Sequence, residues 1–478
     1  MLFNSIDFAI FLPIVFILYW FVFQKNIKWQ NLLIVIASYV FYGWWDYRFL
    51  ALILFSTVVD YSIGLLLTKT DNQTQRKFWL WCSIIVNIGF LGFFKYYNFF
   101  IDNFVTAFTF LGNSIRPNTL DIILPVGISF YTFQTLSYTI DVYREKLKPT
   151  NDFVAFTAFV SFFPQLVAGP IERATHLLPQ FFKKKQFDYS NAVDGLRQIL
   201  WGLFKKIVIA DNCAFFVNTI FNGYESYSGS ALLLGAIFFA FQIYGDFSGY
   251  SDIAIGTSRL FGFDLRQNFA FPYFSRDIAE FWRRWHISLT TWFRDYIYIP
   301  LGGSRGSKFN QIRNVFIIFI ISGFWHGANW TFIIWGLLNA IYFLPLLLRK
   351  KNRLHTDVVA ENSVLPSLKE LVLMLSTFIL ATIGWVFFRS PSVGDAMGYL
   401  GRMFNLQLLS IPTVRPTFLI ILIGIFILVE WSGRRQLHAL EKLWLGYPRL
   451  VRLSIYYVIA MIIFLYGGKS QEFIYFQF

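Results

Sequence analysis

The sequence predicts an all-α polytopic membrane protein with about 11–12 transmembrane helices. Of its 478 residues, 56% are hydrophobic and 21% aromatic, whereas only 14% are charged. Soluble domains carry about 25% charged residues. Apolar runs recur along the chain at about the twenty residues that a helix needs to cross the hydrocarbon core of a bilayer. The runs are continuous rather than alternating, which argues against a transmembrane β-barrel.

The net charge of +14 is not accompanied by a nucleic-acid recognition motif or a soluble domain, so we expect no nucleic-acid partner. It is typical of a membrane protein whose Lys and Arg residues collect in cytoplasmic loops and face anionic lipids. Cys82 and Cys213 lie in or beside apolar segments and predict neither a disulfide framework nor a thiolate metal site. The first 23 residues lack a basic leader and a cleavage site, which predicts a retained span.

The first part of the chain contains five predicted spans and two irregular segments. The spans are residues 6–23, 31–44, 49–67, 78–94 and 120–142. Residues 98–118 are amphipathic and predict an interfacial helix. The apolar run 153–167 is broken by Pro164, Gly169 and Pro170 and has basic flanks on both sides. We therefore expect a re-entrant element that is buried in protein or lines a cavity.

Seven further spans are predicted in the rest of the chain. They are residues 207–221, 231–244, 315–330, 331–348, 370–388, 418–431 and 455–466. The glycine-containing stretch 245–256 predicts a break after the second of them, and residues 260–300 are too charged to span. Residues 351–369 are predicted to form a cytoplasmic linker, and both termini are expected outside. No boundary or repeat divides the chain, so we expect a single integral-membrane domain over residues 1–478.

The stretch SGFWHGANW, residues 322–330, places a histidine at membrane depth, where ionisable side chains are costly and usually functional. A neutral imidazole can take a proton from an attacking hydroxyl near neutral pH, so His326 is a candidate general base. Gly323, Gly327 and Ala328 would let another backbone or a substrate approach the ring. The alternative is a structural histidine that only hydrogen-bonds a neighbouring helix.

A second candidate lies in the aromatic, arginine-rich segment FWRRWHISL. There we expect His286 to face His326 across a cavity, while Arg283 and Arg284 hold an anionic substrate. The alternative is that these arginines bind lipid headgroups.

Other chemistries have weaker support. No His-Glu-x-x-His or paired-cysteine pattern predicts a metal site, and no Walker loop predicts ATP hydrolysis. The glycines around Asp246 follow an apolar run rather than a strand, which argues against a dinucleotide site. The remaining histidines, His176, His355 and His438, are expected at the surface.

Several motifs together resemble the membrane-bound O-acyltransferases, most closely their bacterial alginate O-acetyltransferase branch. In chain order they are PVGISFYTFQ (125–134), AGPI (168–171), DFSGYSD (246–252), RRWHISL (283–289), WFRDYIYIPLGG (292–303), WHGANW (325–330) and FIYFQF (473–478). The resemblance covers nearly the whole chain. It implies a funnel of tilted, re-entrant and interfacial helices around a central tunnel that is open to both sides of the membrane.

The resemblance also implies an activity, which is O-acyl transfer without a bound cofactor. The acyl donor would be acetyl-CoA or a related thioester that enters from the cytoplasm. His326 would be the catalytic histidine and His286 the second tunnel histidine. A partner outside the membrane, such as an SGNH-type acetyltransferase, would complete the O-acetylation of a polysaccharide. We therefore expect a multi-pass enzyme of the inner (cytoplasmic) membrane.

Six further residues are candidate substrate-binding residues because they lie in these motifs or in basic segments. They are Arg283, Arg284, Asn329, Gln134, Asp246 and Lys308. The three cations among them would pair with the phosphates of the donor. Two other functions stay open: D-alanyl transfer to teichoic acid from a carrier protein, and a transporter or flippase without acyl chemistry. A transporter should show paired halves with broken helices in corresponding places, and the expected breaks share no repeated context.

Overall fold

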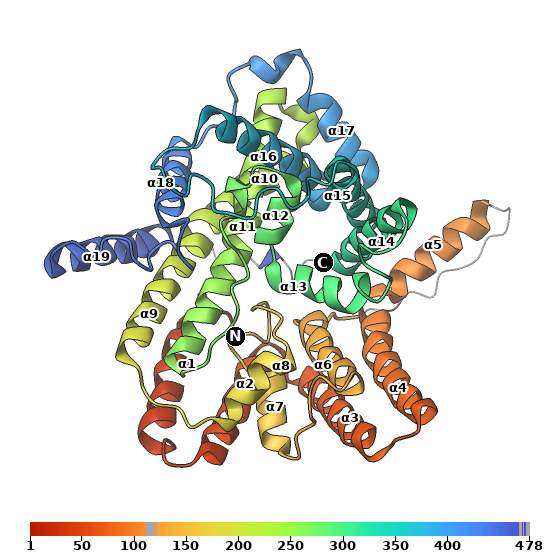
Figure 1. Cartoon of the computed structure of the whole chain (residues 1–478). Coiled ribbons are helices and arrows are strands. Elements are labelled where there is room, and N and C mark those ends of the chain that lie inside the picture. The colour runs from red at the N-terminus through yellow and green to blue at the C-terminus, as the bar shows by residue number, and fades with distance from the viewer. Residues whose placement is uncertain (111–119, 121, 468–470, 472, 475–478) are drawn as a thin grey trace. The chain divides into compact units, whose positions relative to one another are not determined.

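Helices joined by loops make up the computed structural model, and no strand occurs in the parts of the chain that it describes (Figure 1). These parts are residues 1–110, 120, 122–467, 471, 473 and 474. The all-α prediction is confirmed. Residues 111–118 of the predicted interfacial helix and residues 475–478 of the FIYFQF motif lie outside the described residues.

Long apolar helices identify the chain as a multi-pass membrane protein. Six stretches are long and apolar enough to cross a membrane: Ile27–Lys69, Gln73–Thr109, Gly229–Leu260, Trp330–Leu348, Leu368–Arg389 and Arg449–Tyr466. Two shorter apolar helices cover Ile6–Val22 and Thr417–Gly433. The predicted number of crossings, about 11–12, stays a prediction.

The chain folds as two compact units, although the sequence shows no boundary between them. The first unit comprises residues 1–192 and 257–266, and the second comprises residues 193–256 and 267–478. That both units act as one acyltransferase domain stays a prediction.

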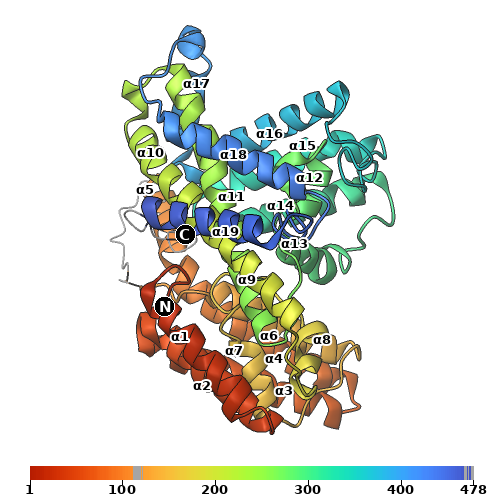
Figure 2. The same ribbon diagram turned by 90° about the vertical axis from the view of Figure 1, so that its left-hand side faces the viewer.

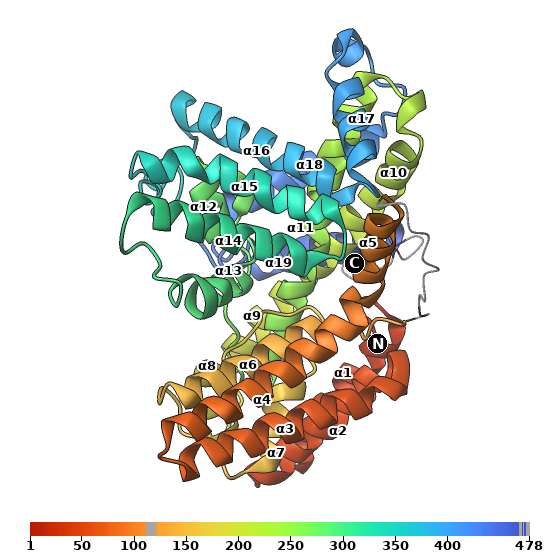
Figure 3. The ribbon, with the colours of Figure 1, turned by 90° about the vertical axis from the view of Figure 1, so that its right-hand side faces the viewer.

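Helix packing through small and polar side chains defines the first unit. Its longer helices are α1 (Ile6–Ile17), α2 (Ile27–Asp46), α3 (Leu50–Lys69), α4 (Gln73–Leu91), α5 (Tyr97–Phe110), α6 (Ile128–Tyr143) and α7 (Phe153–Ser161). Helix α6 packs against α3 and α4, and α2 packs against α7 (Figure 3). Buried Asp60 of α3 accepts hydrogen bonds from Ser83, Asn87 and Thr139 at 2.5, 2.8 and 2.9 Å. Such bonds join helices that have no hydrophobic driving force between them in lipid.

The predicted span 120–142 was wrong over its first residues, because α6 begins only at Ile128. Pro125 lacks a backbone N–H, and Gly127 has a φ of 76°, a left-handed conformation that favours glycine. A Cβ at Gly127 would lie 2.6 Å from the carbonyl oxygen of Leu166. The turn that precedes α6 therefore depends on a close backbone approach.

The predicted break in the apolar run 153–167 is confirmed. Helix α7 ends at Ser161, ahead of Pro164, and residues 162–172 are buried without continuing the helix. Proline disfavours the helical conformation of the residue before it. The irregular backbone is tolerated because it is packed inside protein.

The second unit holds the remaining long helices, including residues 193–203 of α9 and 229–256 of α11. They are α9 (Tyr189–Leu203), α10 (Asp211–Asn222), α11 (Gly229–Leu260), α12 (Ile278–Arg284), α13 (Ile287–Phe293), α14 (Lys308–His326), α15 (Trp330–Leu348), α16 (Leu368–Arg389), α17 (Val393–Met403), α18 (Thr417–Gly433) and α19 (Arg449–Tyr466). A π-helical turn, η5 (Phe204–Ala210), joins α9 to α10. No helix was predicted at α9 or α17, because their apolar residues occupy only one face and form no continuous apolar run.

The predicted break at residues 245–256 was wrong, because α11 is continuous through them. The glycines serve close packing instead. A Cβ at Gly249 would lie 2.8 Å from the carbonyl oxygen of Gly202, and one at Gly256 would lie 2.5 Å from that of Gly195. Small residues at such positions let two helix backbones approach.

Candidate active site

The position of His326 follows from the pairing of α14 with α15, which lie side by side (Figure 3). A Cβ at Gly323 would clash with the carbonyl oxygen of Phe332, and one at Gly336 with that of Phe319. Glycine at both positions therefore lets the two backbones touch. Helix α14 ends at His326 itself, four residues before the end of the predicted span, because Gly327 adopts an extended conformation.

Aromatic rings enclose the His326 imidazole, of which only 4% is exposed. Its centroid lies 4.9 Å from Trp325, 5.1 Å from Trp335 and 5.2 Å from Phe388, and the Trp335 ring is nearly perpendicular to it at 89°. These neighbours come from α14, α15 and α16. Packing of this kind restricts the rotamer of a functional side chain and keeps bulk water away from it.

His286 lies between α12 and α13 in a strained backbone conformation, with a φ of 43°. A residue with a Cβ enters the left-handed region at a cost of about 1–3 kcal/mol, and such residues cluster at functional sites. Asn268 offsets this cost, because its backbone carbonyl accepts from Ile287 N at 2.8 Å. The side-chain oxygen of Asn268 also accepts from Ser288 N at 3.2 Å and from the Ser288 hydroxyl at 2.9 Å.

The same Asn268 oxygen fixes the tautomer of His286. It lies 3.1 Å from His286 Nδ1. Because it also accepts from a backbone N–H, this atom is the oxygen of the amide and not its nitrogen. An amide oxygen only accepts, so the proton of the neutral ring is on Nδ1 and the lone pair is on Nε2.

One cavity, which we call the histidine cavity, is lined by both histidines. Its volume is about 60 Å³. It is lined by Trp282, Trp285, His286, Leu289, Thr290, Phe293, Ile318, Phe319, Ser322 and His326. A few convergent polar groups in an apolar lining are typical of small-molecule sites. The volume suits a group of acetyl size, since a single water needs at least about 10–15 Å³ on this measure.

The two predicted anion-binding arginines hold a loop instead of lining this cavity. We call residues 349–367, between α15 and α16, the strap. Arg283 donates to the strap carbonyls of Asn352 at 2.7 Å and His355 at 2.6 Å. Arg284 donates to the carbonyl of Asp357 at 2.8 Å.

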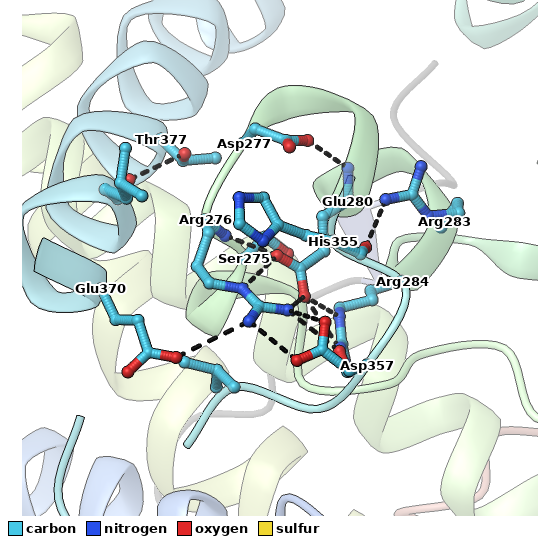
Figure 4. Close-up of polar contacts among 12 residues, drawn as sticks. Ser275, Arg276, Asp277, Glu280, Arg283, Arg284, His355, Asp357, Glu370 and Thr377 are labelled. Atoms are coloured by element: carbon cyan, nitrogen blue, oxygen red, sulfur yellow. Dashed lines mark hydrogen bonds and ion pairs between the residues drawn. The ribbon is translucent and has the colours of Figure 1, made fainter. Parts of the chain in front are cut away.

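An ion-pair cluster, of which Arg276 and Glu280 are buried and Asp357 is exposed, lies beside these contacts (Figure 4). We call Arg276, Glu280, Arg284 and Asp357 the arginine clamp. Arg276 meets both oxygens of Glu280 at 3.1 Å and Asp357 at 2.9 Å, and Arg284 pairs with Glu280 at 2.9 Å. The hydrogen bond from Arg276 holds the pKa of the Asp357 carboxyl below its usual value. The clamp and the two arginines thus tie the strap to α12 and the residues before it.

The other four candidate substrate-binding residues are not among the described residues that line the histidine cavity. Asn329 caps α15 by accepting from Thr331 N at 3.0 Å and donates to the Pro391 carbonyl at 2.9 Å. Asp246 pairs with Lys206 at 2.7 Å. Lys308 is exposed at the start of α14, and Gln134 is a buried residue of the first unit. None of the six is among the described residues that line the cavity, and their substrate-binding role stays a prediction.

Sequence reasoning missed Asn268 and misplaced His438. Asn268 is fully buried, yet nothing around it in the sequence separates it from an ordinary loop asparagine. His438 was expected to be solvated, but its side chain is buried and its Nε2 lies 3.2 Å from the Asp194 carboxylate. The loop after α18 that carries His438 contacts Asp194 of α9, a helix that was not predicted from the sequence. His176 and His355 are half-buried.

Comparison with known proteins identifies the family. The family model named membrane-bound O-acyltransferase matches residues 148–356, a range that contains both histidines. The probable alginate O-acetylase of Pseudomonas syringae pv. tomato is 42% identical over 408 residues, which cover 85% of this chain and 75% of that protein. The chain belongs to the membrane-bound O-acyltransferase family. It is therefore an O-acyltransferase and not a transporter without acyl chemistry.

Two other relatives act on different polymers according to their names. The peptidoglycan O-acetyltransferase of Helicobacter pylori is 36% identical over 436 residues, covering 85% of this chain and 80% of that protein. The teichoic acid D-alanyltransferase of Streptococcus thermophilus is 30% identical over 285 residues, covering 54% of this chain and 66% of that protein. The longer matches are to O-acetyltransferases.

Proposed function

We propose that this O-acyltransferase moves an acetyl group from acetyl-CoA or a related thioester toward the O-acetylation of a polysaccharide outside the cytoplasm. The observation that carries the proposal is the pair of buried histidines that line one cavity of acetyl size. The names of the more extensively matched relatives, alginate and peptidoglycan O-acetyltransferases, support acetyl as the group and a polysaccharide as the acceptor.

In the proposed reaction His326 is the general base. It takes the proton of a hydroxyl, on the acceptor or on a small carrier, as the hydroxyl oxygen attacks the thioester carbonyl carbon. The carbon–sulfur bond then breaks, and the leaving thiolate takes the proton back from the imidazolium. Each turnover forms one ester and one thiol, and the histidine returns to its neutral state.

His286 serves as an orienting group in this scheme. With its proton held on Nδ1 by Asn268, its Nε2 accepts a hydrogen bond. A hydroxyl that donates to Nε2 would be positioned for attack before it reaches His326. Holding the reactants in this way is the kind of contribution that protein groups make by orientation.

The direction of transfer is also part of the proposal. The donor would enter from the cytoplasm, where the basic loops are expected, and an SGNH-type acetyltransferase on the other side of the inner membrane would receive the acyl group. Arg283, Arg284 and Lys308 would meet the donor's phosphates. Both arginines already donate to the strap, so phosphate would bind through the remaining N–H groups of each guanidinium, which has five.

The first test measures ester-linked acetate released by mild alkali from the envelope glycans. It compares the wild type, a deletion, and the deletion carrying His326→Ala at matched protein level. Acetate that is lost in both mutants supports the proposal. Acetate that is unchanged in all three contradicts it.

A second candidate, D-alanyl transfer to teichoic acid, is favoured by the similarity to the streptococcal D-alanyltransferase. The same alkaline extracts distinguish it. Alanine esters that disappear with His326→Ala, while acetate persists, would replace acetyl with D-alanyl as the transferred group.

A further inference from the structure

A second cavity in the second unit lies among α11, α16 and α18, and we call it the side pocket. Its volume is about 300 Å³, at the lower end of the size range of ligand pockets, roughly 300–1,000 Å³. It is lined by Phe241, Tyr244, Phe271, Tyr273, Phe274, Leu371, Met374, Leu375, Phe378, Phe426, Ile427 and Glu430. Neither of the two histidines of the histidine cavity is among them.

The polar side chains in this lining are already bonded to protein. Glu430 accepts from Trp201 Nε1 at 2.7 Å through one carboxylate oxygen and from the Tyr244 hydroxyl at 2.6 Å through the other. The Tyr273 hydroxyl donates to the Ala240 carbonyl at 2.6 Å. A ligand in the side pocket therefore meets an apolar surface.

The mouth of the pocket opens between two apolar helices, α16 and α18, at residues whose side chains are exposed. Leu375 of α16 is 53% exposed, and Ile427 of α18 is also exposed. Helix α16 is long and apolar enough to span a membrane, and α18, seen in Figure 2, is a shorter apolar helix. The exposed residues beside the mouth, Ile379 and Leu428, are apolar as well. Hydrocarbon is the solvent that such helix faces meet in a bilayer.

The strap closes one end of the side pocket. Val359 and Ala360 pack against Met374, together with Phe274 and Trp431. Arg434 fixes this part of the strap by donating to the carbonyls of Val359 at 3.0 Å and Ala360 at 2.8 Å. The lining residues Leu375 of α16 and Ile427 of α18 are exposed, which places the entrance between these two helices.

The inner wall of the side pocket is shared with the histidine cavity. The rings of Tyr244 and Tyr273, which line the pocket, lie 6.1 and 5.9 Å from the ring of Trp285. Trp285 in turn lines the histidine cavity next to His286. One indole thus separates the two spaces, so whatever fills the side pocket supports the wall beside His286.

We propose that the side pocket binds one hydrocarbon chain of a membrane lipid, inserted between α16 and α18. Water would find too few open polar partners there, and an empty apolar cavity forfeits contacts on its lining. The chain gains little from the hydrophobic effect, because it leaves a medium as apolar as the pocket. Its gain is the dispersion contact made by filling the cavity. The inference does not depend on which acyl group the enzyme transfers.

The test uses the full chain in vesicles of phosphatidylcholine and phosphatidylglycerol that contain a phosphatidylcholine with a diazirine in one acyl chain. After illumination, mass spectrometry locates the labelled residues. Phe426 is 1% exposed, whereas Leu428 on the same helix is 66% exposed. Label on Phe426 therefore reports a chain inside the pocket, and label on Leu428 reports lipid around the protein.

Leu375→Trp places an indole at the mouth, and Ile379→Trp is its matched control, since it lies one turn further on α16, is 54% exposed and does not line the pocket. We expect labelling of Phe426 in the wild type and in Ile379→Trp, and a several-fold loss in Leu375→Trp. Labelling of Leu428 should be equal in all three. Met374→Phe, which fills the pocket from its wall, should act as Leu375→Trp does.

Two results would overturn the proposal: label confined to Leu428 in the wild type, or label on Phe426 that survives both filling variants. Equal thermal unfolding midpoints of Leu375→Trp and Ile379→Trp show that a loss of label is not a loss of fold. A second arm with a diazirine fatty acid identifies the source of the chain. Labelling of Phe426 by the phospholipid but not by the fatty acid assigns the chain to an intact lipid, and the reverse assigns it to a free acyl chain.

Discussion

The histidine cavity and the arginine clamp both use residues of α12, and their polar groups are used differently. The cavity places two imidazoles among aromatic rings, and none of the described residues in its lining is an Asp, Glu, Lys or Arg. The clamp pairs its two arginines with the carboxylates of Glu280 and Asp357 and with a main-chain carbonyl. Paired charges hold chain segments in place, whereas a neutral imidazole can take up a proton. Variants at His326, Arg276, Asn268 and Arg283 test whether this division is real.

The largest expected effect is on activity at the cavity. We expect His326→Gln to lower thioester-dependent transfer by roughly 10²–10⁴-fold, the usual contribution of a general base. The thermal unfolding midpoint should stay close to that of the wild type, because glutamine keeps a polar side chain of similar size. Turnover and unfolding are measured on the same lipid-reconstituted sample. Transfer within tenfold of the wild type would remove His326 from the reaction.

The next effect is on stability at the clamp. Arg276→Met leaves Glu280, which is 1% exposed, without its principal partner. Removing one member of a buried ion pair costs about 3–5 kcal/mol, so we expect a low yield of folded protein and a lower unfolding midpoint. Activity per folded molecule should be retained. The double variant Arg276→Met, Glu280→Gln should recover part of the loss.

The comparison would fail if Arg276→Met unfolded at the wild-type temperature but lost turnover. The clamp would then take part in the reaction, and paired charge would not mark a structural role in this protein.

A smaller effect is expected at Asn268, which connects the backbone around the cavity to its chemistry. Asn268→Ala removes the acceptor of the His286 Nδ1 proton. One hydrogen bond contributes about 1 kcal/mol, which corresponds to about a fivefold loss of turnover. Asn268→Asp gives a sharper readout. A carboxylate beside the ring stabilises the imidazolium and raises the His286 pKa, so the acid limb of the pH–rate profile should move to higher pH. An unmoved acid limb would leave Asn268 with a purely structural role.

The smallest effect is expected at Arg283, whose exposed guanidinium donates only to main-chain carbonyls among its recorded hydrogen bonds. Arg283→Ala should change stability by no more than about 1 kcal/mol, as for an exposed pair. Arg435→Ala is the matched control, because Arg435 is also bonded to strap carbonyls, those of Ala360 and Ser363. We expect the donor KM to rise for Arg283→Ala and not for Arg435→Ala, because Arg283 is proposed to meet the donor's phosphates. Equal donor KM values in the two variants would remove Arg283 from the donor site.

The sequence motifs predicted the two histidines of the cavity but not the partners of the two arginines. His286 and His326 were identified from two motifs about forty residues apart, and the structure brings them to one cavity. Arg283 and Arg284 were predicted to bind an anion because they are adjacent cations in an aromatic segment. Their partners on the strap lie about seventy residues further along the chain. No local pattern shows such a partner.

Properties that are local to one segment could be predicted from the sequence. A run of apolar residues makes a membrane helix because each helix satisfies its own backbone hydrogen bonds in hydrocarbon, and Pro164 ends α7 through its own ring. Tertiary structure decided what depends on a second segment. Gly249 packs against Gly202 and does not break α11, Asn268 sets the tautomer of His286, and the side pocket exists only where α16 and α18 leave a gap. The physical reason is that hydrocarbon acts on each helix separately, whereas a close approach, a shared proton or a cavity is a property of two surfaces that meet.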